Sequence, residues 1–219
     1  MSPTDCVRLF TVFFKMMSIY IQTIMLRTLV HSFGEGFTDK DTTHSYLDLY
    51  ESLLQKKKDT ARAVLEVGIG DFGHKNGGSI KLWRDYFPNA TVYALDILPR
   101  HRIMDELLND DRVIIHASSN AYDEGFFTRE FLNKNIKCDF MLDDGPHSLD
   151  SMKNFIKLYS QIMTDDGILI IEDVQDMSWL EILREEVPEH LKPYVKWYDL
   201  RPNKNRYDDI VFTIDKSIS

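Results

Sequence analysis

The 219-residue sequence contains very little cysteine. Cys6 and Cys138 are its only two cysteines, and they lie too far apart in the chain to form a Cys-x-x-Cys metal or redox motif. Two isolated thiols supply no disulfide framework, and their use is typical of a reducing compartment. We therefore expect a cytoplasmic protein.

Positive charge is also scarce. The chain has 26 Lys and Arg residues against 35 Asp and Glu residues, which gives a formal net charge of −9. Because such a surface repels phosphate backbones and anionic lipid head groups, we expect no nucleic-acid partner. Internal repeats and low-complexity tracts are absent from the sequence. Its 43% hydrophobic and 28% charged residues exclude collagen-like, coiled-coil and wholly disordered chains.

One apolar run, residues 9–30, is long enough to span a bilayer. Its polar residues are spaced to form a single stripe on a helix: Thr11, Lys15, Ser18 and Gln22. We expect this helix to pack into the domain or against a second copy of the chain in a homo-oligomer. A membrane anchor is the alternative. A secretory signal is disfavoured, because no small-residue cleavage site follows the run.

Downstream of this run, short segments rich in Val, Ile and Leu alternate with longer helical patterns. The predicted strands are 63–67, 91–95, 112–116, 138–142 and 167–171. The predicted helices are 46–58, 79–87, 100–108, 124–132, 148–163 and 178–186. Since the strand segments are apolar on both faces and separated by helices, they indicate parallel strands that are covered on both sides.

The end of the chain breaks this rhythm. Two strand-like runs, 195–200 and 209–214, are joined by the turn-rich segment 201–205, which is too short for a crossover helix. These two strands therefore pair antiparallel. Five βα units followed by such a hairpin predict an α/β, doubly wound, Rossmann-like sheet of the class I methyltransferase type. We assign this domain to residues 46–219, with residues 1–45 as a helical extension and cofactor-covering loop.

The first predicted strand runs into a glycine turn. Gly68 and Gly70 begin a literal Gly-x-Gly-x-x-Gly, which brings backbone N–H groups close to a ligand. The following helix starts only near Ser79, whereas in NAD-binding proteins it starts inside the motif and meets the pyrophosphate. The second strand ends in Asp96, and a carboxylate there can accept both hydroxyls of a ribose. The pattern favours S-adenosylmethionine over NAD.

Acidic residues follow two further strands of the predicted sheet. Asp144 and His147 come after the fourth strand, and Glu172 and Asp173 come after the fifth. The carboxyl ends of parallel strands open on one crevice, so these side chains are expected to converge. The three acids offer hard oxygen ligands that suit Mg²⁺, which lowers the pKa of a hydroxyl that it touches. His147 is the predicted general base. We place Asp143 with the cofactor-binding residues, not with the metal ligands.

At these residues the chain resembles the metal-dependent sugar O-methyltransferases of macrolide biosynthesis, of the mycinamicin and macrocin type. The likeness covers about residues 38–173. The run Asp144-Gly145-Pro146-His147 is similar to the family's Asp-Gly-Ser-His motif. The resemblance implies that Asp144, Glu172 and Asp173 are metal ligands and that His147 is the catalytic base. It further implies a cofactor site made by Thr38, Lys40, Tyr46, Tyr50, Glu66, Gly68, Gly70, Ser79 and Asp96.

The chain departs from the family pattern in three places. The usual Gly-Asp-Gln after the third strand is replaced by Ala-Ser-Ser-Asn at residues 117–120, and Pro146 stands where the family has a small polar residue. The apolar residues 9–30 stand in place of a larger N-terminal domain. These departures bear on the adenine contacts and on the acceptor.

Together the motifs predict an S-adenosylmethionine-dependent, Mg²⁺-assisted O-methyltransferase that acts on a sugar hydroxyl of a glycan or glycosylated metabolite. One alternative is a catechol-type methyltransferase, in which aromatic side chains line the acceptor pocket. Trp179, Tyr198 and Tyr207 are the candidates for such a wall. The other alternative is a non-catalytic assembly protein with the same fold. The retained carboxylates and base argue against this loss of chemistry.

Overall fold

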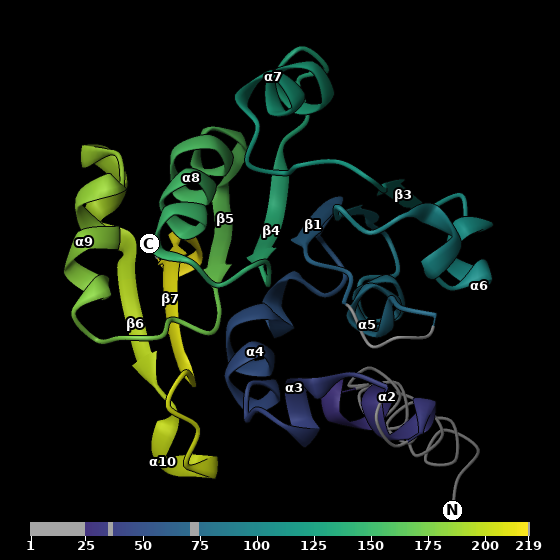
Figure 1. Ribbon diagram of the computed structural model, residues 1–219, viewed down its shortest axis with the longest axis horizontal. Helices are drawn as coiled ribbons and strands as arrows, with labels where there is room; N and C mark the ends of the chain where they lie inside the picture. The colour runs from purple at the N-terminus through teal and green to yellow at the C-terminus, as the bar shows by residue number, and fades with distance from the viewer. Residues whose placement is uncertain (1–24, 35–36, 71–74, 219) are drawn as a thin grey trace, which may run out of the picture.

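A seven-stranded sheet forms the centre of the molecule. The computed structural model describes residues 25–34, 37–70 and 75–218. The strands of this part of the chain are Ala63–Val67 (β1), Thr91–Leu95 (β2), Val113–His116 (β3), Cys138–Asp143 (β4), Met163–Ile171 (β5), Val195–Asp199 (β6) and Ile210–Asp215 (β7). They lie in the order β3-β2-β1-β4-β5-β7-β6 (Figure 1). β1 to β5 are parallel, and β7 is antiparallel to both β5 and β6. The predicted Rossmann-like sheet with an antiparallel end is confirmed.

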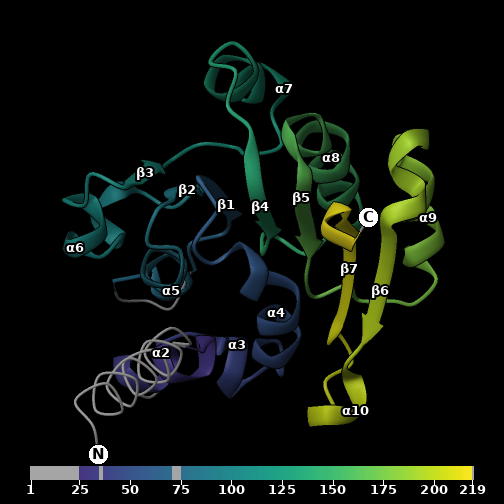
Figure 2. The same ribbon diagram turned by 180° about the vertical axis from the view of Figure 1, so that it is seen from behind.

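Helices cover both faces of this sheet (Figures 1 and 2). They are Leu26–Phe33 (α2), Asp39–Thr42 (α3), Leu47–Leu54 (α4), Gly78–Tyr86 (α5), Asp105–Leu108 (α6), Glu124–Phe127 (α7), Leu149–Tyr159 (α8), Trp179–Glu186 (α9) and Arg201–Lys204 (α10). Apolar residues of α7, α8 and α9 pack into one hydrophobic core, and those of α2, α4, α5 and α6 pack into the other. Short helical turns join these elements: Gln55–Lys57, Arg100–Arg102, Thr128–Leu132, Ser160–Ile162, Glu189–Tyr194 and Lys216–Ile218.

The central strand β1 shows how the sequence builds both cores. Successive side chains of a strand point to opposite faces. Leu65 and Val67 belong to the core beneath α8, and Val64 belongs to the core beneath α5. Glu66 shares the face of Val64 and is fully buried. Its carboxylate accepts a hydrogen bond of 2.7 Å from the Ser79 hydroxyl on α5, so this acid is satisfied within the layer of helices.

Some element boundaries differ from the predicted ones because tertiary pairing overrides the local pattern. β5 begins at Met163, where the sequence predicts the end of a helix, since this residue pairs with Cys138 of β4. The predicted helix 100–108 is interrupted at Ile103, which forms a bridge with Asn76. The predicted loop 201–205 contains α10, with a proline in its first turn, where the missing N–H leaves no intrahelical bond unmade.

The C-terminal part of the apolar run 9–30 packs into the domain. Leu26 and Val30 of α2 are buried in the core shared with α4 and α5, and the Leu26 N–H donates to Glu51 at 2.7 Å. Residues 9–24 lie outside the described residues, so the predicted homo-oligomer contact through this run stays a prediction. In the described ranges, no helix has the length and hydropathy needed to cross a membrane.

Gly68 is required where the chain turns out of β1, and its replacement gives a first test. Its φ of +96° is unfavourable for residues with a side chain, and a Cβ would lie 1.9 Å from the carbonyl oxygen of Asp144. We expect Gly68→Ala to lower the free energy of unfolding by more than the roughly 1–3 kcal/mol of backbone strain alone. Urea unfolding measures this loss.

Gly34→Ala is the matched control, because Gly34 has a φ of +99° and a Cβ added there would meet nothing within 4 Å. It carries the strain without the clash. Equal losses in the two variants would contradict the close approach of the glycine turn to Asp144.

Candidate cofactor and catalytic site

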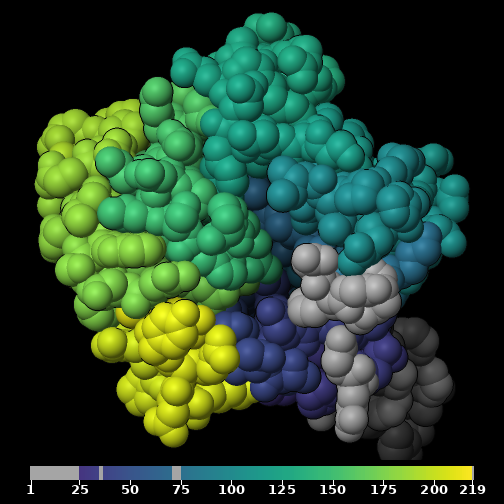
Figure 3. Space-filling model, in the orientation of Figure 1, coloured from purple at the N-terminus to yellow at the C-terminus, as the bar shows by residue number. Residues whose placement is uncertain are grey.

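A cavity of about 610 Å³ opens at the carboxyl ends of β1, β2 and β4. Its wall is formed by five loop segments and the start of α5: residues 37–39, 67–70, 95–98, 119–122, 144–147, Gly78 and Ser79. Figure 3 shows the surface hollowed where the green segments meet the blue and teal ones. This is the edge of a doubly wound sheet where ligands bind, and the volume is that of a small-molecule site.

Half of the predicted cofactor residues reach this cavity and half do not. Those in the wall are Thr38, Gly68, Gly70, Ser79 and Asp96. The others, Lys40, Tyr46, Tyr50, Glu66 and Asp143, are buried and do not belong to the cavity wall. Their place in the structure is behind the site, where their polar groups are held by other buried side chains.

Asp96 holds together the loops that follow β1 and β2. Its two carboxylate oxygens accept hydrogen bonds from the backbone N–H groups of Ile69, at 2.6 Å, and Leu98, at 2.8 Å. A carboxylate oxygen has a second lone pair for a ligand hydroxyl. Ser119 and Asn120, from the segment that departs from the family pattern, lie in the same wall. They occupy the place that the family pattern assigns to adenine contacts.

Three of the predicted chemical groups lie close together, and two of them, Asp144 and His147, belong to the cavity wall. Single donor atoms of Asp144, His147 and Asp173 lie within 4.8 Å of one another. The His147 Nε2 is 3.2 Å from Asp144 Oδ1 and 3.6 Å from Asp173 Oδ2. Both His147, with φ of 51°, and Asp173, with φ of 55°, adopt the left-handed conformation. Such strain in residues with side chains persists where the surroundings determine it, commonly at functional sites.

The third predicted ligand, Glu172, faces a different set of partners. Its carboxylate is buried and accepts hydrogen bonds from the Tyr50 hydroxyl and from the Lys40 ammonium, at 2.5 Å. Lys40 also donates to Asp144 at 2.8 Å. The convergent pair Asp144 and Asp173 therefore fits a hard divalent cation beside His147, whereas Glu172 is joined to Asp144 through Lys40.

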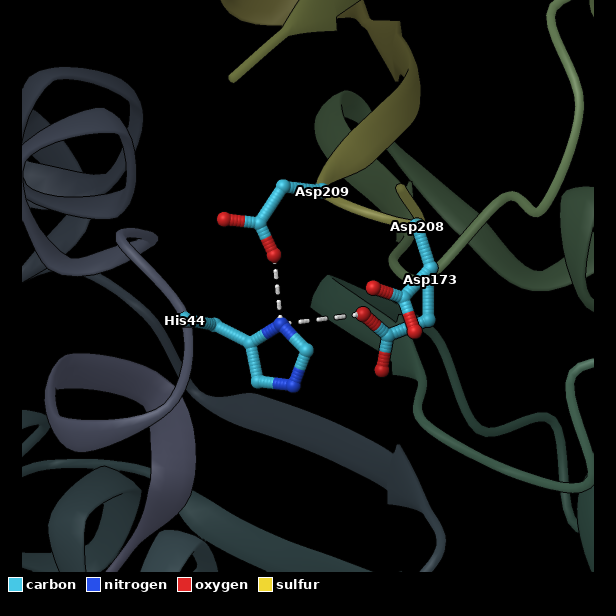
Figure 4. A group of neighbouring side chains, drawn as sticks. All are labelled: His44, Asp173, Asp208 and Asp209. Carbon is cyan, nitrogen blue, oxygen red and sulfur yellow. Dashed lines mark hydrogen bonds and ion pairs between the residues drawn. The ribbon is translucent and has the colours of Figure 1, made fainter. Parts of the chain in front are cut away.

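A second polar cluster lies next to the first, and its residues are His44, Asp173, Asp208 and Asp209 (Figure 4). His44 Nδ1 lies 2.6 Å from an Asp209 oxygen and 3.3 Å from Asp173 Oδ1. The Tyr46 hydroxyl donates to Asp173 as well. Asp173 thus faces His147 with one oxygen and His44 with the other. The sequence indicated the His44 segment but gave no prediction for Asp208 and Asp209. Their only signal in the sequence is that two acids adjoin the start of the last predicted strand.

Carboxylates surround His147, the predicted base. Burial lowers the pKa of His147, but the hydrogen bond to Asp144 and the nearby carboxylates raise it more, so the net shift is upward from 6.5. Burial raises the pKa of Asp144, but Lys40 and His147 lower it by more. The net shift of this pKa is downward, so the carboxyl stays ionised. A carboxylate only accepts hydrogen bonds. The His147 Nε2 therefore carries the hydrogen that faces Asp144, and Nδ1 is left as the basic nitrogen.

The sheet order, the glycine turn and the acid at the end of β2 define a class I methyltransferase fold. Known proteins agree. The solved structure of MycE methyltransferase from the mycinamycin biosynthetic pathway, in complex with Mg and SAH, superposes with a TM-score of 0.63 at 19% identity, over 82% of this chain and 52% of MycE.

Curated relatives are sugar O-methyltransferases by name. The 8-demethyl-8-(2-methoxy-alpha-L-rhamnosyl)-tetracenomycin-C 3'-O-methyltransferase of Streptomyces olivaceus is 29% identical over 60% of this chain and 32% of its own length. Mycinamicin VI 2''-O-methyltransferase of Micromonospora griseorubida is 24% identical over 62% of this chain and 33% of its own. No family model matches the chain. The resemblance indicated by the motifs is confirmed, and the chain spans about a third of the length of these relatives.

The buried carboxyl of Asp143 is expected to make the free energy of unfolding depend on pH. Burial raises its pKa to about 7, against the opposing hydrogen bond of 2.5 Å from the Tyr122 hydroxyl. An unfolded Asp titrates near 3.9, so the folded chain holds this proton more tightly. The stabilisation is complete below about pH 4 and is lost as the pH rises to about 7. Asp143→Asn keeps an acceptor for Tyr122 and cannot ionise.

We therefore expect Asp143→Asn to gain stability over the wild type between pH 5 and pH 7, by up to about 1.4 kcal/mol per pH unit. Urea unfolding at pH 5, 6 and 7 measures the difference. Parallel pH profiles of the two proteins would show that Asp143 is already ionised in the folded state.

Proposed function

We propose that this chain is the catalytic domain of an S-adenosylmethionine-dependent O-methyltransferase that acts on a hydroxyl of a glycosylated acceptor. One observation carries the proposal. The base His147 and the acid Asp144 stand in the wall of the same cavity that has Asp96 and the glycine turn at its other end. A nucleoside held by Asp96 therefore lies in one enclosed space with a proton acceptor. Methyl transfer needs this arrangement, because it requires an in-line approach and a deprotonated oxygen.

The cofactor end supports a nucleoside without a pyrophosphate. Gly68 and Gly70 bring the backbone of the glycine turn to the cavity, and Asp96 offers its free lone pairs to the ribose hydroxyls. Ser79 stands at the start of α5, in the same wall. Thr38 closes the cavity from the N-terminal side, ahead of the first strand. The predicted roles of Tyr46, Tyr50 and Lys40 become supporting ones in this proposal.

His147 supplies the proton acceptor. With the Nε2 hydrogen directed at Asp144, the Nδ1 lone pair would take the hydroxyl proton of the acceptor, and S-adenosylmethionine would supply the methyl group to that oxygen. Asp144 and Asp173 stabilise the imidazolium that results. The left-handed backbone of His147 aims the ring from the turn that follows β4.

Mg²⁺ fits beside the base. Asp144 and Asp173 would hold it, with Glu172 as the third predicted ligand on the far side of Lys40. When bound, this cation lowers the pKa of the acceptor hydroxyl. Lone carboxylates so close together would otherwise repel one another. The resident groups also bind and orient: Tyr46 holds Asp173, and Tyr50 holds Glu172.

The acceptor class is supported by the relatives, whose names specify rhamnosyl, olivosyl and mycinamicin compounds. We propose a sugar hydroxyl as the nucleophile. The three aromatic residues that a catechol-type pocket would need lie elsewhere. Trp179 and Tyr198 pack against the two cores, and Tyr207 lines a separate cavity of about 400 Å³ near α10.

Replacement of His147 tests the catalytic step. We expect His147→Ala and His147→Asn to lower kcat by about 10²–10⁴-fold, with the affinity for S-adenosylmethionine nearly unchanged in calorimetry. Asn tolerates the left-handed backbone at this position, so it separates loss of the base from loss of the turn. Turnover at the wild-type level in the Asn variant would remove His147 from the mechanism.

The pH dependence tests the same group independently. Only the neutral imidazole accepts a proton, and the nearby carboxylates raise the pKa of His147 above 6.5. Because a bound divalent cation would offset the same carboxylates, the titration is followed without metal. We expect the His147 imidazole, observed by NMR in EDTA, to titrate with a midpoint above 6.5. Asp144→Asn, assayed for cofactor binding as its control, is expected to move the midpoint to lower pH. A midpoint well below pH 6 in the wild type would contradict the assignment.

A further inference from the structure

Lys40 is the most completely buried cation among the described residues of the site. Its side chain has 0% exposure, and its ammonium group touches three acids that come from β1 and from the ends of β4 and β5. The distances from Nζ are 2.5 Å to Glu172, 2.8 Å to Asp144 and 3.8 Å to Glu66. An ammonium group with three acidic neighbours neutralises part of their charge.

Two of these acids, Asp144 and Glu172, are among the three ligands predicted for Mg²⁺. Asp144 uses Oδ2 for Lys40 and Oδ1 for His147, and both oxygens of Glu172 accept hydrogen bonds, from Lys40 and Tyr50. A divalent cation that takes Glu172 as a ligand must share its oxygens with these donors or displace one of them. It must also approach a fixed positive charge on the same pair of carboxylates. The like charges repel strongly where little water screens them.

We propose that Lys40 is a built-in counter-cation that competes with a divalent metal ion for Asp144 and Glu172. This inference deepens the proposed function, since it concerns the same acids. When no metal ion is bound, the Lys40 ammonium keeps these acids in place. When an ion is present, the ammonium lowers the affinity of the acids for it. The cation then binds weakly and exchanges with the solvent.

If Lys40 instead helps the acids to bind the metal ion, the effect of its removal on metal affinity has the opposite sign. If Lys40 only orients Asp144 and Glu172 toward a shared metal ion, its removal loosens the ligands and weakens binding. If it competes, its removal leaves two buried acids, Glu66 and Glu172, and the partly buried Asp144 without their cation, and strengthens binding. The sign of the change in metal affinity therefore decides between positioning for the ion and competition with it.

The test uses the full chain and Mn²⁺ as the probe, with free Mn²⁺ measured by electron paramagnetic resonance. We expect Lys40→Met to bind Mn²⁺ at least tenfold more tightly than the wild type. In EDTA this variant is expected to melt at a lower temperature than the wild type, with the loss reversed by Mn²⁺ or Mg²⁺. Lys40→Gln removes the charge but keeps an N–H donor, and it is expected to bind Mn²⁺ more tightly as well.

Lys57 provides a matched control. It is also a buried lysine, at 3% exposure, and its ammonium pairs with Asp166 at 2.8 Å, near the amino end of β5 and away from the site. Lys57→Met is expected to lower the melting temperature without changing Mn²⁺ affinity or the response to EDTA.

Each other outcome has a defined meaning. Equal or weaker Mn²⁺ binding by both Lys40 variants would overturn the inference while leaving metal assistance in place. Failure of both to fold at saturating Mn²⁺ would overturn it too, because the ammonium would then not be replaceable by a metal ion. An absence of Mn²⁺ binding in every protein, the wild type included, would overturn both this inference and the metal-assisted part of the proposed function.

Discussion

Buried negative charge at the carboxyl edge of the sheet is the constraint on which the rest of the site depends. Acids from β1, from the ends of β4 and β5 and from the start of β7 meet in one region: Glu66, Asp144, Glu172, Asp173 and Asp209. Ions away from water are costly unless they are paired and hydrogen-bonded. Many of their partners come from one stretch of chain, α3 and α4 with the turn between them. Lys40, His44, Tyr46 and Tyr50 each contact at least one of these acids. Other partners, Ser79 and His147, lie elsewhere in the chain. The acid cluster is therefore complete only when this stretch is docked.

This arrangement also crosses the domain boundary that the sequence suggested. The division between residues 1–45 and 46–219 remains a prediction. Lys40 and His44 lie on one side of it, and the acids of the cluster that they contact lie on the other. The described end of the N-terminal extension, α2, is tied to the same stretch, because Arg27 pairs with Asp41 at 2.6 Å and with Asp48 at 2.8 Å. The described end of the extension is therefore joined by ion pairs to the stretch that contacts the acids.

The sheet was predictable from sequence because its signals are local and repeated. β1 and β2 coincide with the predicted ranges, because short continuous apolar runs flanked by turn residues are typical of buried strands. The ends of β4 and β5 were equally readable, and Asp144, His147 and Asp173 meet as expected. The start of β5 was not predictable, because it depends on an irregular pairing with β4 that the local sequence does not show. Lys40 illustrates the harder case. Nothing in its immediate sequence shows that its partners are 104 and 132 residues away, so a residue expected at the cofactor is found between carboxylates.

The position of β7 has a consequence for biosynthesis. This strand inserts between β5 and β6, and the residue just before it, Asp209, contacts His44. A nascent chain can form β1 to β5 while it is still being translated, but β5 then has an open edge where β7 belongs. The acid edge gains Asp209 only after residues 209–215 have left the ribosome. The half-made sheet must therefore be shielded from pairing with other chains until the last strand closes it.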